Sequence, residues 1–343
     1  MASTDWKESI APGEAEHLEA LAAQLHAIQR ARAARTGLPA DRALHAKGNA
    51  GLSAELVVRD DVPAALRVGI FAKAATYRAY ARYSNGSGGR ADDRKGDVRG
   101  LAVKLVGVPG KKLIPGLDDA VTQDFLLIRT PTTPMRTAAE FIAIVDAAQS
   151  PALLPFRLMG KLGIGRTFQI LRKAVPGLNK PVMPLAATTY FTAVPVMWGA
   201  HAVKLSLVAR DAAPAQAPKR TSPNGLGDEL AARLAQGPVI YDLCAQLFVD
   251  EASTPIEDPS VEWTDAVAPP HKIAELTIAK QDPSSARGKK LAAFVETLSF
   301  DPWHAPVEFR PLGELMRARN PAYRLSTKER LAAPEPDGTE SFD

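Results

Sequence analysis

Apolar and β-branched residues gather in short segments along most of the chain, and the segments fall into two groups of four. The first group lies at 51–59, 78–84, 98–107 and 123–129. The second group lies at 188–195, 201–210, 239–250 and 273–280. Gly, Asp or Pro residues bound many of these segments, and runs of this kind between turn residues predict β-strands.

Three other segments have apolar residues at helical spacing. Residues 13–35 are rich in Ala, Leu and Glu, the block 138–174 is interrupted near Pro151 and Pro155, and a short helix is expected at 226–236. Four strands, a helical insertion, four more strands and a helical C-terminus predict an α+β fold. We expect an eight-stranded antiparallel β-barrel with helices packed around it.

The same pattern suggests how the chain is organised. A helical arm is expected over residues 1–40, and a barrel domain over 41–330. The remaining residues, 331–343, carry Pro, Gly and acidic side chains but few apolar ones, so they predict a flexible tail.

Composition narrows the class of protein. The 343 residues carry 42 Lys and Arg against 38 Asp and Glu, a net charge of +4, and the basic residues are scattered. This balance argues against nucleic acid as a partner. Cys244 is the single cysteine, which excludes an intramolecular disulfide and fits a reducing compartment. With no signal-peptide pattern and no run of about 18 apolar residues, we expect a soluble cytoplasmic protein without stable membrane insertion.

Two stretches carry candidate chemistry. RALHAKG at 42–48 places His45 between an apolar pair and a Lys-Gly turn, and such a histidine is either packed or catalytic. In RARNPAYRLSTKER at 317–330, helical spacing puts Arg319, Tyr323 and Arg330 on one face. An arginine beside a phenol favours the phenolate, a hard ligand that suits ferric iron. The alternative is an ordinary surface helix with an Arg-Tyr stack.

These stretches occur in the order found in a known family. The sequence resembles the haem catalases, and more closely their short catalase-related bacterial relatives. The shared motifs are RALHAKG at 42–48, RYSNGSGGRADDRKGDVRGLAVKL at 82–105, and an Arg-x-x-x-Tyr at 319–323 with a further arginine at 330. Segments 241–263 and 308–319 are also similar, so the resemblance spans about residues 40–330.

The resemblance implies a haem b cofactor with its iron and a role for each matching residue. His45 would be the distal acid-base residue, with Ser84 hydrogen-bonded to its other ring nitrogen. Tyr323 would be the iron ligand on the opposite face of the haem, kept ionised by Arg319. The residues expected to line the haem or to pair with its propionates are Leu44, Arg42, Arg82 and Arg330.

One segment departs from the family pattern. The family has Asn-Thr-Pro followed by two phenylalanines, and the alignment puts Arg129 in place of the asparagine and Thr133 and Pro134 in place of the phenylalanines. A guanidinium that faces the haem would stabilise the oxygen that leaves when the O–O bond breaks. The alternative is that Arg129 points to solvent or to a propionate.

Three hypotheses about function follow. The favoured one is a peroxidase that reduces hydrogen peroxide or an organic hydroperoxide with a small organic electron donor, and has weak catalase activity. The second is an isomerase of lipid hydroperoxides, for which the glycines at 160–165 leave room. The third is a non-catalytic haem-binding protein, which the presence of both His45 and Tyr323 argues against. Because the chain is short, we expect a monomer or a homodimer.

Overall fold

The computed structural model describes residues 2–37, 39–179, 183–210 and 222–342. All neighbouring strands in its sheet run antiparallel. The strands are β1 (Gly48–Val58), β2 (Ala75–Asn85), β3 (Arg99–Val106), β4 (Thr122–Ile128), β5 (Tyr190–Phe191), β6 (Val196–Trp198), β7 (His201–Ala209), β8 (Val239–Leu247) and β9 (His271–Ile278).

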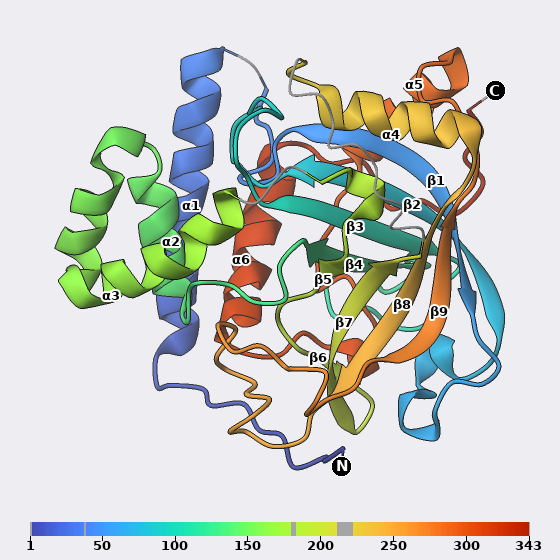
Figure 1. Ribbon diagram of the computed structural model, residues 1–343, viewed down its shortest axis with the longest axis horizontal. Helices are drawn as coiled ribbons and strands as arrows, with labels where there is room; N and C mark the ends of the chain where they lie inside the picture. Colours follow the sequence, from blue (N-terminus) through green and yellow to red (C-terminus); the bar gives the residue numbers. More distant parts are fainter. Residues whose placement is uncertain (1, 38, 180–182, 211–221, 343) are drawn as a thin grey trace.

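The sheet closes into a barrel. The strand order is β5-β4-β3-β2-β1-β9-β8-β7-β6, and a further pairing between β5 and β7 joins the ends. Tyr190 of β5 pairs with Leu207, and Val196 of β6 pairs with Val203, so β5 and β6 follow one another along the same edge of β7. The short strands β5 and β6 therefore count together as one of the eight strands of the barrel. The predicted eight-stranded antiparallel barrel is therefore confirmed (Figure 1).

Helices cover the barrel from outside (Figure 1). In the described part of the chain they are α1 (Glu14–Thr36), α2 (Ala138–Ala147), α3 (Leu154–Asn179), α4 (Gly225–Gln236), α5 (Ala286–Thr297) and α6 (Glu314–Glu329). The predicted helices at 13–35, 138–174 and 226–236 are present, while 211–221 of the connection before α4 lies outside the described residues. None of the described helices has the length and apolarity required to cross a bilayer.

Strand alternation gives the barrel two different faces. On β3, Leu101, Val103 and Leu105 point into the apolar core. The intervening residues point outward, toward the helices. A β-carbon added to Gly51, on the outer face of β1, would lie 2.8 Å from the Val295 side chain of α5, which shows how closely this helix packs on the sheet.

A buried ionic cluster ties the last residues of the chain to the outer face. The Lys104 ammonium lies 2.7 Å from a carboxylate oxygen of Asp124 and 2.5 Å from one of Glu335. The hydroxyl of Thr122 is 2.8 Å from Nε2 of His304 and 3.0 Å from Glu335. Residues 331–343 thus contact the barrel through Glu335. Their flexibility and the division of the chain at 40/41 and 330/331 stay predictions.

Replacing Lys104 with methionine should be strongly destabilising. Lys104 is fully buried, and the change leaves the Asp124 carboxylate buried without its cation. Breaking a buried pair in this way costs about 3–5 kcal/mol. Urea unfolding should show this loss, whereas Lys111→Met should change stability by less than about 1 kcal/mol, because the pair of Lys111 with Asp118 is exposed. Equal losses in the two variants would contradict the account.

Candidate functional site

His45 lies in the loop before β1 in a backbone conformation that is uncommon for residues other than glycine. Its φ angle is 55°, and its backbone N–H donates to the carbonyl oxygen of Gly86 at 3.1 Å. Nδ1 of the ring is 2.9 Å from Oγ of Ser84, the contact expected from the sequence. Unfavourable backbone geometry of this kind is concentrated at functional sites. These contacts place the imidazole of His45 against Ser84 of β2.

The imidazole packs against a row of residues on the outer face of the barrel. Ser84 of β2 pairs with Gly100 of β3, and Gly100 pairs with Ile128 of β4. A β-carbon on Gly100 would approach Cε1 of His45 to 2.6 Å and Oγ of Ser84 to 3.2 Å. Only glycine leaves space for the ring at this position.

The surroundings of His45 keep its ring neutral. Burial lowers the pKa of His45 to about 3, and the positive charges of Arg82, Arg319 and Arg42 act in the same direction. When Nδ1 donates to Ser84, Nε2 is the ring atom that accepts a proton. His45 is thus arranged as a proton acceptor at neutral pH.

Tyr323 and Arg319 interact on α6 as the sequence predicts. Nη2 of Arg319 donates to the phenol oxygen of Tyr323 at 2.9 Å, and the guanidinium carbon lies 5.2 Å from the ring centroid. The helix continues through Pro321. Leu44 packs against the same buried apolar cluster as Ala318 and Ala322 of α6. The backbone N–H of Ala43, in the His45 loop, donates to Oγ of Ser326 on α6 at 3.4 Å, so this loop contacts the helix that carries Tyr323.

Three arginines that are distant in the sequence converge on α5. Arg42 and Arg82 bind the carboxylate of Glu296 at 2.5 Å and 2.9 Å. Arg82 also donates to the carbonyl oxygen of His45 at 3.0 Å. Arg42 and Arg330 both donate to the carbonyl oxygens of Glu296 and Leu298. Glu296, which no motif in the sequence singles out, is therefore the centre of the cluster.

This arginine cluster, consisting of Arg42, Arg82, Arg330 and Glu296, is not neutral. Three guanidiniums face one carboxylate, so two positive charges have no counterpart within the cluster. Burial and the positive charge of Arg82 lower the pKa of Arg330 to about 10, against the opposing charge of Glu296. Guanidiniums form their strongest hydrogen bonds with carboxylates and phosphates. The cluster thus has the charge to hold a ligand with two carboxylates.

The structure separates Arg129 from His45. The backbone N–H of Arg129 donates to the carbonyl oxygen of Arg99 at 3.0 Å, which extends the β3–β4 ladder by one pair. Ile128 shares the outer face with Gly100, so Arg129, one residue later, lies on the opposite face. Burial and the positive charge of Arg99 lower the pKa of Arg129, and the negative charge of Asp97 opposes this effect. The residue of β4 that shares a face with Gly100 is Ile128, and the role expected of Arg129 stays a prediction.

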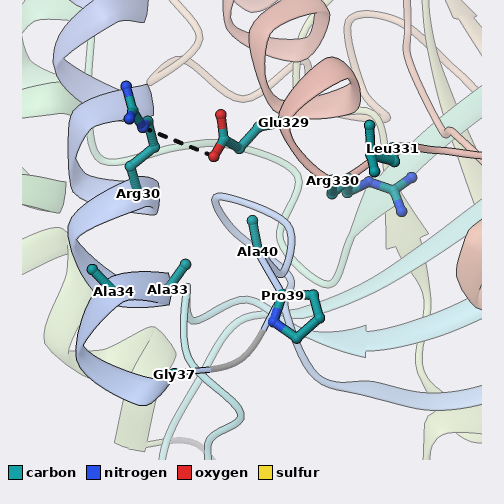
Figure 2. A pocket seen from close by; sticks show the side chains of 9 residues that line it. All are labelled: Arg30, Ala33, Ala34, Gly37, Pro39, Ala40, Glu329, Arg330 and Leu331. Atoms are coloured by element: carbon teal, nitrogen blue, oxygen red, sulfur yellow. Dashed lines mark ion pairs between the residues drawn. The ribbon is translucent and has the colours of Figure 1, made fainter.

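A cavity opens between α1 and the end of α6 (Figure 2). Its volume is about 500 Å³. Arg30 on α1 lies opposite Glu329, with 3.9 Å between Nε and the nearest carboxylate oxygen. Arg330 lines the cavity too, so the arginine cluster borders it. Ala33, Ala34, Pro39, Ala40 and Leu331 supply apolar surface.

The low pKa of His45 gives a prediction for pH dependence. In the unfolded chain this histidine binds a proton below its ordinary pKa of 6.5, whereas in the folded chain it does so only near pH 3. The contribution of His45 to stability is therefore present above pH 6.5 and is lost progressively as the pH falls toward 3. Between pH 7 and pH 4, the free energy of unfolding should fall less for His45→Gln than for the natural protein. Parallel curves would contradict the neutral state of His45.

Known proteins resemble the chain in sequence and in fold, although no family model matches it. It is 30% identical over 319 residues to a catalase-related peroxidase of Mycolicibacterium paratuberculosis (strain ATCC BAA-968 / K-10), and the match covers 89% of this chain and 93% of that protein. A fungal catalase, with 16% identity and a TM-score of 0.66, has the same fold over 88% of this chain. Catalase A from Saccharomyces cerevisiae, with 16% identity and a TM-score of 0.65, has it over 89%.

The solved catalases are longer proteins. The chain spans 61% of the fungal catalase and 64% of the Saccharomyces cerevisiae enzyme. At these identities the structures establish the fold alone, whereas the relative from Mycolicibacterium matches nearly end to end. The chain has the catalase fold and belongs to the catalase-related peroxidases, a family of oxidoreductases.

Proposed function

We propose that the protein is a haem-dependent peroxidase that reduces hydrogen peroxide or an organic hydroperoxide with electrons from a small organic donor. The observation that carries the proposal is the position of a neutral His45 and an Arg319–Tyr323 pair in one site. In the balanced reaction, ROOH and two donor molecules AH give ROH, water and two donor radicals. Cytoplasmic location, a role in oxidative stress and a monomeric or dimeric state stay predictions.

The side chains fit haem b. Haem carries two propionates, and the arginine cluster has two positive charges without a counterpart. The phenol of Tyr323, hydrogen-bonded to Arg319, is an oxygen donor of the kind that ligates haem iron in catalase. Haem b, when bound, supplies the iron that binds the peroxide and exchanges electrons with it. In this proposal Tyr323 holds the iron, and Arg42, Arg82 and Arg330 hold the propionates.

In this proposal, His45 transfers a proton between the two oxygens of the peroxide. Its Nε2 takes the proton from one peroxide oxygen and returns it to the other oxygen, which leaves as water or an alcohol. The contact with Ser84 keeps the ring orientation and the tautomer constant through this transfer. Because nearby positive charges disfavour the imidazolium, the proton is released readily to the leaving oxygen.

The wall beside His45 favours peroxidase over catalase activity. Ile128 pairs with Phe191 of β5, so the outer-face row continues from Gly100 with two half-buried apolar side chains. Dismutation requires a second hydrogen peroxide to be held by a polar group while it is oxidised. Neither Ile128 nor Phe191 can donate a hydrogen bond from its side chain. We therefore infer weak oxygen release.

The second candidate function is isomerisation of a lipid hydroperoxide. The apolar wall formed by Ile128 and Phe191 is the observation that favours it. An isomerase rearranges its substrate without an external donor, so the two functions differ in whether the donor is oxidised.

Oxygen release and donor oxidation test the proposal together. In the haem-loaded protein, hydrogen peroxide or tert-butyl hydroperoxide should drive oxidation of a phenolic donor with little oxygen release, and His45→Gln should reduce the rate by about 100-fold or more. Ile128→Asn should increase oxygen release from hydrogen peroxide, and Arg129→Asn is the matched control on the other face. Rapid oxygen release by the natural protein would contradict the proposal, and consumption of a lipid hydroperoxide without donor oxidation would favour the isomerase.

The cavity next to Arg330 offers an approach for the donor. We propose that the donor binds there, at the propionate side of the site, where apolar surface and the Arg30 guanidinium suit an anionic aromatic molecule. Ala34→Phe should fill part of the cavity and raise the KM for the donor several-fold, with the KM for peroxide unchanged. Ala31→Phe, on the same helix but outside the cavity, should leave both constants unchanged. Unchanged donor kinetics in Ala34→Phe would contradict this site.

A further inference from the structure

Helix α3 exposes large apolar side chains to solvent. Phe156, Ile164 and Phe168 are 68%, 76% and 67% exposed, and Leu153, just before the helix, is 51% exposed. Phe156 and Phe168 are also the two exposed aromatic residues in the described part of the chain. Single apolar side chains scattered over a surface need no explanation, whereas several large ones on one element indicate an interaction surface.

The packing of α3 does not require these side chains. The helix contacts α2 through its other side, where Leu158 lies in a buried apolar cluster with Ala143 and Ala147 of α2. Leu162 and Leu171 pack against the same cluster. The exposed apolar side chains are therefore additional to those that hold α3 against α2.

The shape of α3 leaves its outer side open to a partner. The helix bends at Gly163, whose φ of 76° and ψ of 164° are accessible essentially only to glycine. After the bend, Ile164 and Phe168 are four residues apart and lie on the same side of the helix, with Arg172 one further turn along. Figure 1 shows α3 at the left edge of the molecule, beyond α1.

The same helix is strongly basic. Arg157, Arg172 and Lys173 are exposed and form no ion pair with any described residue. Two further basic residues of α3 pair with acidic side chains of α2. No Asp or Glu occurs between residues 147 and 210. We call the exposed apolar and basic residues of the helix the α3 surface, which consists of Phe156, Arg157, Ile164, Phe168, Arg172 and Lys173.

Charge and composition favour an anionic lipid bilayer as the partner of the α3 surface. Helices that lie in the membrane interface combine Phe, Leu or similar residues with Lys and Arg. A second copy of the chain, paired through the same surface, would bring like charges together. Because no described helix is long and apolar enough to cross a bilayer, contact through α3 would be peripheral.

We propose that the α3 surface binds the interface of membranes that contain anionic phospholipids. Its apolar side chains enter the boundary between the headgroups and the acyl chains, and its basic side chains contact the lipid phosphates. This binding does not depend on haem or on the proposed peroxidase activity.

Sedimentation with lipid vesicles tests the proposal. At about 0.1 M salt, the full-length protein should bind vesicles of equal parts phosphatidylglycerol and phosphatidylcholine at least about tenfold more tightly than vesicles of phosphatidylcholine alone. Phe168→Ser should weaken binding by about tenfold or more, and Arg157→Gln by about fivefold. The matched controls Val307→Ser and Lys111→Gln, which change exposed residues elsewhere, should bind as the natural protein does.

Two outcomes of this experiment would overturn the proposal. One is equal binding to the two kinds of vesicle, or none to either. The other is a dimer in solution that Phe168→Ser converts to a monomer without any vesicle binding, which would assign the α3 surface to a second copy of the chain.

Tryptophan fluorescence locates the contact without removing an apolar side chain. Bromine atoms on acyl chains quench a tryptophan that enters the bilayer. With phosphatidylglycerol vesicles of brominated lipid, the emission that Phe168→Trp adds to the natural protein should be quenched, whereas the emission that Val307→Trp adds should not. Equal quenching in the two variants, or none in Phe168→Trp, would contradict contact through α3.

Discussion

The carboxylate of Glu296 forms the interaction on which the proposed site depends. It binds Arg42 from the loop that carries His45 and Arg82 from the strand that carries Ser84. The carbonyl oxygen of the same residue accepts from Arg330, at the end of the Tyr323 helix. One position on α5 therefore joins the segments that bear the candidate acid-base residue, its hydrogen-bond partner and the candidate iron ligand. The cluster keeps a positive charge that a dicarboxylate ligand would neutralise.

The barrel contributes residues to the proposed site through its outer face. Its interior is packed with apolar side chains, so a large cofactor has no space there. Outside, the row Ser84, Gly100, Ile128 and Phe191 forms one wall. The His45 loop contacts α6, the helix that carries Tyr323, through the hydrogen bond from Ala43 to Ser326. Glycine at position 100 is required by the approach of the imidazole. The site thus lies between sheet and helices, where loops and strand faces from distant parts of the sequence meet.

The sequence predicted the strands because alternation and turn residues are local properties, and it predicted the Arg319–Tyr323 contact because helical spacing is regular. It did not predict which face of β4 each residue occupies. Register depends on pairing with β3, and a shift of one position would exchange the faces of Ile128 and Arg129. Glu296 and Glu335 were missed for a related reason, because their partners are distant in the sequence and no motif surrounds them.

The central proposal is that Tyr323 provides the ligand for a haem iron and that Arg319 donates a hydrogen bond to its phenol oxygen. Resonance Raman spectroscopy of the ferric, haem-loaded protein tests it most directly. The account predicts phenolate vibrations enhanced in the natural protein, weakened in Arg319→Gln and absent in Tyr323→Phe. A natural spectrum without phenolate vibrations, or one that Tyr323→Phe leaves unchanged, would contradict the assignment and with it the proposed site.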